Sequence, residues 1–119
     1  MHFWLHTCGN VEQLLPRLIE LGVDVLHPVQ KFAMDERKIA ADYGGQIAFW
    51  VGFDVQQTIP FGTPEDVRRE VHHLLDTFYR PDGRLLFTMG NGVTGDTPLA
   101  SLQVLFEEVF AYGTQVINR

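Results

Sequence analysis

Apolar runs and amphipathic stretches alternate four times along the chain. Each apolar run is short and typical of a strand, and each following stretch repeats its apolar residues at the spacing of a helix. The expected strands cover residues 3–8, 23–27, 46–53 and 84–89. The expected helices cover residues 11–21 and 35–43 and two stretches that begin at Thr63-Pro64 and Thr97-Pro98. Such alternation predicts parallel strands joined by right-handed crossovers.

Residues at the helix ends support these boundaries. In each Thr-Pro pair, a capping residue precedes a proline at the first helical position, where proline is favoured. Asp35 is expected to cap the helix at residues 35–43. The segment after Asp54 is expected to be a loop, and His72-His73, which lie among charged residues, are expected to face solvent.

The number of units limits the architecture. A complete (β/α)8 barrel typically needs about 250 residues, whereas this chain has 119 and forms one domain at most. Four parallel strands could belong to an open, doubly wound sheet or to half of an eight-stranded barrel, and the apolar pattern does not separate the two. We therefore expect a single α/β domain over residues 1–119.

Composition and charge exclude several classes of protein. The formal net charge is −6 and there are only 9 Lys and Arg residues, which argues against nucleic acid as a partner. One cysteine cannot form an internal disulfide and suits a reducing compartment. No apolar run approaches the roughly 20 residues of a membrane span. We expect a soluble, cytoplasmic protein that binds neither nucleic acid nor membrane.

Polar residues follow every expected strand. Since the carboxyl ends of parallel strands meet at one edge of a sheet, these residues should gather at the usual active face of such a fold. The set consists of His6, Cys8, His27, Gln30, Asp54, Gln56, Gln57 and Asn91, to which Asp96 in the last loop can be added.

His6 and Cys8 carry the clearest chemical signal. Side chains alternate along a strand, so these two residues point to the same face. Imidazole and thiolate are preferred zinc ligands, and a catalytic zinc site keeps one position open. Simpler interpretations stay open: Cys8 as a buried apolar residue, His27 as a loop residue or one that supports a ligand, and Asp54 as a hydrogen-bond acceptor for the next turn.

Four segments resemble the uroporphyrinogen decarboxylase superfamily, which includes the decarboxylases and zinc-dependent methyltransferases acting on corrinoid proteins and thiols. The segments are HTCGN at residues 6–10, LGVDVLHPVQ at 21–30, GFDVQ at 52–56 and PFGTPEDV at 60–67. The resemblance runs from residue 2 to about residue 113 and covers only the C-terminal half of that family's (β/α)8 barrel. It implies that this chain is half of a barrel.

The resemblance also implies roles for individual residues. In the methyltransferase branch, His6 and Cys8 correspond to the first two zinc ligands. Asn91 stands where that branch has a third ligand, a cysteine, and where the decarboxylases have a histidine. Asp54 and Asn91 are expected to act in the chemistry.

The remaining expectations concern bound groups and partners. His27, Gln30 and Gln56 are expected to contact the cofactor or substrate. A free half-barrel leaves both sheet edges unpaired, so we expect a homodimer that closes the barrel or a separate N-terminal half.

Three function classes remain open. They are zinc-dependent methyl transfer involving a corrinoid protein or a thiol, decarboxylation of a tetrapyrrole, and a non-catalytic half-barrel that assembles with itself or with a partner chain.

Overall fold

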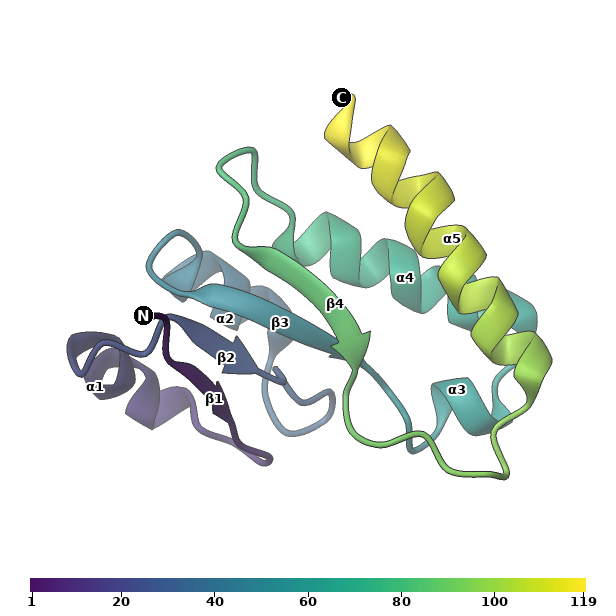
Figure 1. The fold of residues 1–119 in the computed structure, drawn as a ribbon, viewed down its shortest axis with the longest axis horizontal. Coiled ribbons are helices and arrows are strands. Elements are labelled where there is room, and N and C mark those ends of the chain that lie inside the picture. Colours follow the sequence, from purple (N-terminus) through teal and green to yellow (C-terminus); the bar gives the residue numbers. More distant parts are fainter.

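A computed structural model describes residues 1–119 (Figure 1). Its elements are, in chain order, β1 (Trp4–His6), η1 (Glu12–Leu14), α1 (Leu15–Glu20), β2 (Val25–His27), α2 (Glu36–Tyr43), β3 (Ala48–Phe53), α3 (Thr58–Phe61), α4 (Pro64–Phe78), β4 (Leu85–Met89) and α5 (Leu99–Ile117). The four alternating strand and helix units predicted from the sequence are all present.

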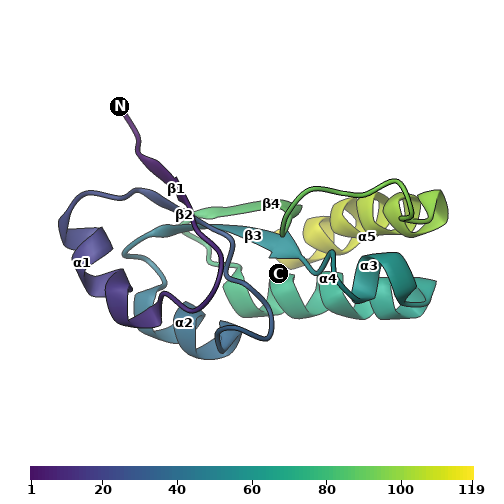
Figure 2. The same cartoon turned by 90° about the horizontal axis from the view of Figure 1, so that it is seen from below.

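The strands form one sheet in which neighbours along the chain are neighbours in space. The order is β1-β2-β3-β4, and every pair is parallel. The helices α1 to α4 lie on one side of this sheet, and α5 packs on α4 beyond the β4 edge (Figures 1 and 2). A doubly wound sheet reverses its strand order and carries helices on both faces. The chain is therefore four consecutive βα units of a (β/α)8-type barrel, which is half of such a barrel.

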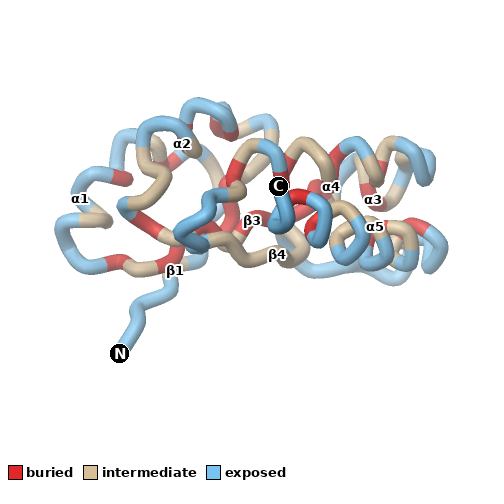
Figure 3. The backbone as a smooth tube through the Cα atoms, turned by 90° about the horizontal axis from the view of Figure 1, so that it is seen from above, coloured by how far each residue is buried: buried red, intermediate tan, exposed pale blue.

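The main core lies between the sheet and its helices (Figure 3). Alternate residues of β3 point into it, and α4 contributes an apolar stripe with the helical spacing that the sequence shows. The buried members from these two elements are Phe49, Val51, Phe53, Val67, Val71, Leu74, Leu75 and Phe78. Burial of this stripe supplies the main drive for docking α4 onto the sheet.

The opposite face of the sheet carries no helix (Figure 2). Trp4 and Trp50 meet there edge to face, with ring centroids 5.2 Å apart, yet Trp4 is still 50% exposed. In a closed barrel this face lines the interior. The half-barrel thus shows to solvent a surface that a complete barrel would bury.

The helix-end signals are largely confirmed. Thr63 and Asp66 form a reciprocal capping box at the start of α4, and Asp35 accepts a hydrogen bond from the backbone N–H of Lys38 at the start of α2. The second Thr-Pro pair behaves differently, because α5 begins after Pro98 and has no side-chain cap.

Two local predictions are wrong. The segment after Asp54 contains the short helix α3 instead of a continuous loop. His72 and His73 do not simply face solvent: each Nε2 lies 2.6 Å from a carboxylate oxygen, of Glu108 in α5 and of Glu36 in α2 respectively. Both contacts join helices that are far apart in the sequence, which local charge patterning could not indicate.

No helix in the structure combines the length and the apolar character that crossing a bilayer requires.

Candidate active site

A pocket of about 440 Å³ opens at the carboxyl ends of the strands. Each strand end contributes to its lining, with Cys8 after β1, Gln30 after β2, Asp54 after β3 and Asn91 after β4. The prediction that polar residues gather at one edge is confirmed for these four. Parallel winding causes this, since all four carboxyl ends lie on the same side.

His6 and Cys8 lie next to each other at the end of β1. Cys8 Sγ is 3.6 Å from His6 Nε2, and both residues are exposed. A tetrahedral zinc ion with one Zn–N bond of about 2.05 Å and one Zn–S bond of about 2.3 Å holds those two ligand atoms about 3.6 Å apart. The distance between these two atoms therefore matches that of two ligands of one zinc ion.

His27 lies directly beside His6, one strand away. The register of the two strands places these residues opposite each other, and their Nδ1 atoms are 2.6 Å apart. His27 Nε2 lies 3.1 Å from the carbonyl oxygen of Met89, and the ring packs against Trp50 with centroids 4.7 Å apart. Both ring nitrogens of His27 are thus engaged inside the protein.

The environment of His27 favours its neutral form. Burial lowers the pKa of His27, nearby His6 lowers it further, and the contact with Met89 opposes these effects. Only 9% of the residue is exposed.

Asp54 uses its carboxylate to organise the chain that follows. Oδ1 accepts a hydrogen bond from the backbone N–H of Gln56, at 3.0 Å. Oδ2 accepts from the backbone N–H and the hydroxyl of Thr58, at 3.0 and 3.2 Å. This arrangement starts α3, and it corresponds to the simpler interpretation of Asp54 as an acceptor for the next turn.

Glu70 and Lys31 support the same loop, although no motif or spacing in the sequence singles them out. Glu70, on α4, is 4% exposed, and its Oε1 accepts the backbone N–H of Asp54 at 2.6 Å. Its other oxygen pairs with Lys31 Nζ at 3.0 Å. Glu70 is 16 residues from Asp54 and 39 residues from Lys31 in the sequence, so only the packing of α4 under the sheet brings the three together.

Gln30, Gln56 and Asn91 complete the pocket wall. Gln30 Oε1 accepts the backbone N–H of Gly9 at 2.6 Å and so joins the loops after β1 and β2. Gln56 is exposed at the pocket. Asn91 is also exposed, and its side-chain oxygen accepts the N–H of Gly92. The cofactor contacts expected of His27, Gln30 and Gln56, and the catalytic roles expected of Asp54 and Asn91, stay predictions.

The residues present fit part of a zinc site. No group of three or more His, Cys, Asp or Glu side chains is arranged to hold a metal ion. His6 and Cys8 therefore supply two suitable ligands, whereas a catalytic zinc site takes three from protein.

Comparison with known sequences agrees with the fold and the strand-end motifs. The family model described as "Uroporphyrinogen decarboxylase (URO-D)" matches residues 2–112, which is nearly the whole chain. A search of curated proteins finds no match. From the extent of the family match, together with the barrel-type winding, we conclude that this chain belongs to the uroporphyrinogen decarboxylase family.

Proposed function

We propose that this chain is the C-terminal half-barrel of a zinc-dependent, methyltransferase-like member of the family. His6 Nε2 and Cys8 Sγ would hold the metal, and the substrates would be a corrinoid protein and a thiol. The observation that carries this proposal is the 3.6 Å spacing of these two atoms, of which Cys8 Sγ belongs to a residue that lines the pocket. Decarboxylation needs no metal ion, so a decarboxylase would have no use for this pair of metal ligands.

The chemistry would follow from the donor set. A thiol that coordinates zinc loses its proton and becomes a nucleophile able to accept a methyl group. This chain's part is to bind the metal through His6 and Cys8, while Gln30 and Asp54 keep the surrounding loops in place through the hydrogen bonds described above.

The third zinc ligand cannot be the cysteine used in the methyltransferase branch, because Asn91 stands at that position here. The amide oxygen of Asn91 is neutral and a poor zinc ligand. His27 and Asp54 already use their side chains in hydrogen bonds. Water, the substrate thiol or a residue from another chain remains to complete the coordination.

The charge of the pocket favours methyl transfer over tetrapyrrole decarboxylation. A tetrapyrrole carries several carboxylates, and proteins bind carboxylates best through arginine and lysine. Lys31 is the only Lys or Arg that lines this pocket, and it is paired with Glu70. The decarboxylase interpretation would need cations from a part of the barrel outside these residues.

Zinc binding is the direct test. The purified protein should take up zinc in competition with a chromogenic chelator, and Cys8→Ser should weaken the affinity by at least about 100-fold. His2→Ala is the matched control, because its imidazole is largely exposed and contacts Asp24, away from the pocket. Failure of the unmodified protein to bind zinc, or equal affinity in Cys8→Ser, would contradict the proposal.

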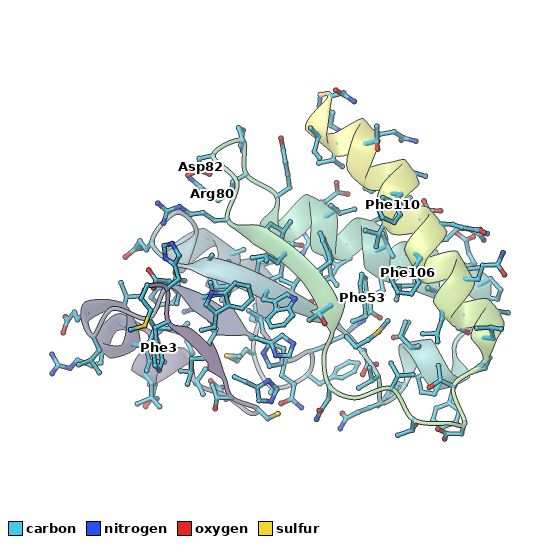
Figure 4. The ribbon with its side chains drawn as sticks, in the orientation of Figure 1. Phe3, Phe53, Arg80, Asp82, Phe106 and Phe110 are labelled. Atoms are coloured by element: carbon cyan, nitrogen blue, oxygen red, sulfur yellow. The ribbon has the colours of Figure 1, made fainter.

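Assembly with a second copy is a further candidate function, and the free edges of the half-barrel favour it. β1 pairs only with β2, and β4 pairs only with β3. Beside the β4 edge, α5 exposes a stripe of apolar side chains; beside the β1 edge, the η1–α1 segment does the same. These residues are Leu99, Phe106, Phe110 and Ile117 at one end, and Leu14 and Leu21 at the other. Figure 4 shows Phe106 and Phe110 on successive turns of α5.

Rotation of a second copy by 180° about the barrel axis would bring each β4 edge beside the partner's β1 edge, with the strands still parallel. It would also set the apolar stripe of α5 against that of the partner's η1–α1 segment. Two contacts of this kind close an eight-stranded barrel.

Light scattering after size exclusion tests this assembly. We expect twice the 13.6 kDa of one chain, and we expect Phe110→Glu to give monomers because it places a charge in the contact. Gln115→Glu is the control, because this exposed position of the same helix lies about 140° around the helix axis from Phe110 and outside the apolar stripe. A monodisperse monomer that does not bind the dye ANS would contradict self-assembly. Assembly only after an N-terminal half is added would indicate a two-chain enzyme instead.

A further inference from the structure

His27 is buried beside the proposed zinc ligands, but both of its ring nitrogens are engaged within the protein and neither is free to bind a metal. Its two ring nitrogens contact His6 Nδ1 and the Met89 carbonyl oxygen. Neutral imidazole has one nitrogen that donates and one that accepts a hydrogen bond. The positions of the protons along this chain of groups can therefore be worked out from its fixed end.

The fixed end is the Met89 carbonyl oxygen, which can only accept. His27 Nε2, at 3.1 Å, must therefore carry the proton. In neutral His27 the other nitrogen, Nδ1, is then an acceptor. The partner at 2.6 Å, His6 Nδ1, has to donate to it. It follows that His6 carries its proton on Nδ1 and that His6 Nε2, the atom facing Cys8 Sγ, keeps a free lone pair.

The opposite arrangement is less favourable. If His6 carried its proton on Nε2, its Nδ1 would be an acceptor, and His27 would have to donate from both nitrogens. That requires a charged imidazolium at a position with only 9% exposure. Burial of an unpaired charge is costly, and the groups in contact with His27 here are an imidazole, an indole and a carbonyl, with no carboxylate among its hydrogen-bond partners.

We propose that His27 is a positioning residue that holds His6 in the tautomer protonated on Nδ1, so that His6 Nε2 is available to a metal or to the Cys8 thiol. The role in metal binding rests on the proposed function, whereas the tautomer is a property of the metal-free protein. Residues that hydrogen-bond to a metal-binding histidine fix its tautomer and orientation in this way, and their loss typically costs 10–100-fold in metal affinity.

Packing makes this contact rigid. His6 and His27 are opposite each other in the register of β1 and β2, and their ring centroids are 4.8 Å apart. Trp50, on β3, packs on the other side of His27. The contacts of His27 thus link β1, through His6, to β4, through the Met89 carbonyl oxygen, and Trp50 fills the space over β3 between them.

Nitrogen-15 NMR of the metal-free protein measures the tautomers directly, because protonated and unprotonated ring nitrogens resonate far apart. At a pH at which His6 is neutral, we expect His6 to be protonated on Nδ1 and His27 on Nε2. A free histidine side chain in water prefers the Nε2-protonated form, so the expected result for His6 differs from the default. Protonation of His6 on Nε2 in the unmodified protein would overturn the proposal, whatever the protein does with zinc.

Two variants then separate positioning from simple space filling. His27→Phe keeps an aromatic ring but removes both hydrogen bonds, and we expect His6 to revert to the Nε2-protonated form. His27→Gln keeps a side-chain acceptor and a side-chain donor, and we expect it to retain much of the original tautomer. Circular dichroism checks that both variants are folded; if His27→Phe is not, the unmodified protein and His27→Gln still decide the matter.

Metal affinity gives the second measurement. Zinc should bind His27→Phe about 10–100-fold more weakly than the unmodified protein, with His27→Gln in between. An Nδ1-protonated His6 that persists in folded His27→Phe would overturn the assignment. If the tautomers are as expected but no protein binds zinc, the positioning role stands and the zinc proposal fails.

Discussion

Substitution of Asp54 tests whether this residue mainly organises the loop after β3. The buried carboxylate accepts three hydrogen bonds, from the backbone N–H of Gln56 and from the backbone N–H and hydroxyl of Thr58. Hydrogen bonds to charged groups contribute about 1.5–3 kcal/mol each. Asp54→Ala removes all three at once.

The expected loss is smaller than the sum of the three. Gln56 is exposed and Thr58 is half-buried, so water can reach the donors that lose their partner. We therefore expect Asp54→Ala to lower the free energy of unfolding by about 2–4 kcal/mol. Asp54→Asn keeps an oxygen for one donor but places an N–H₂ group near others, and about half that loss is expected.

Equilibrium urea unfolding followed by circular dichroism measures these differences. Asp35→Ala is the matched control, since this aspartate caps α2 through a single hydrogen bond to the backbone of Lys38, and it should cost about 1 kcal/mol. If Asp54→Ala is within 0.5 kcal/mol of the unmodified protein, the structural role assigned to this carboxylate is refuted. If Asp54→Asn is folded but loses more turnover than its lower stability explains, Asp54 also takes part in the chemistry.

Three further predictions concern the cap of α4, the contact between β3 and β4, and pH. Thr63→Ala removes the acceptor for the backbone N–H of Asp66 and should lower stability by about 1 kcal/mol in urea unfolding; no change would contradict the capping box. Gly52→Ala places a methyl group against the backbone of Gly90, 2.6 Å from its nitrogen, and should cost about 1–3 kcal/mol because the strands must separate; an unshifted thermal midpoint would refute this close contact. Burial lowers the pKa of His27 from its ordinary 6.5, so the unfolded chain takes up a proton there at higher pH than the folded chain does, and stability should fall as pH drops below about 6.5. His27→Gln should reduce this slope between pH 5 and 7, and an equal slope in both proteins would refute it.

Much of the fold could be predicted because its signals are local. The helical stripe of α4 follows from the spacing of Val67, Val71 and Leu74, and its start follows from Thr63-Pro64. Neighbouring residues determine such features through backbone geometry and hydrogen bonds within one turn. The short helix α3 was missed because Asp54, whose carboxylate accepts hydrogen bonds from Thr58, lies four residues before the helix and could equally well have closed an ordinary turn.

The candidate site could be predicted only in outline. Parallel winding guarantees that residues after the strands share one edge, so Cys8, Gln30, Asp54 and Asn91 were expected together and line one pocket. Their individual partners were not predictable. Glu70 reaches the backbone of Asp54 from α4, and no sequence spacing indicates which helical carboxylate turns inward.

The sequence by itself determined that this chain has four βα units, that His6 and Cys8 come close together at the end of the first strand, and that the chain resembles the uroporphyrinogen decarboxylase family. Only the tertiary structure decided between an open sheet and half of a barrel, because both have the same pattern of strands and helices and differ in where the helices pack. It also decided that His27 contacts His6 and Met89, and the proposed tautomer of His6 is argued from these contacts. The reason is physical: periodicity records which face of an element is apolar, whereas a contact between two residues 21 or 62 positions apart depends on strand register and packing.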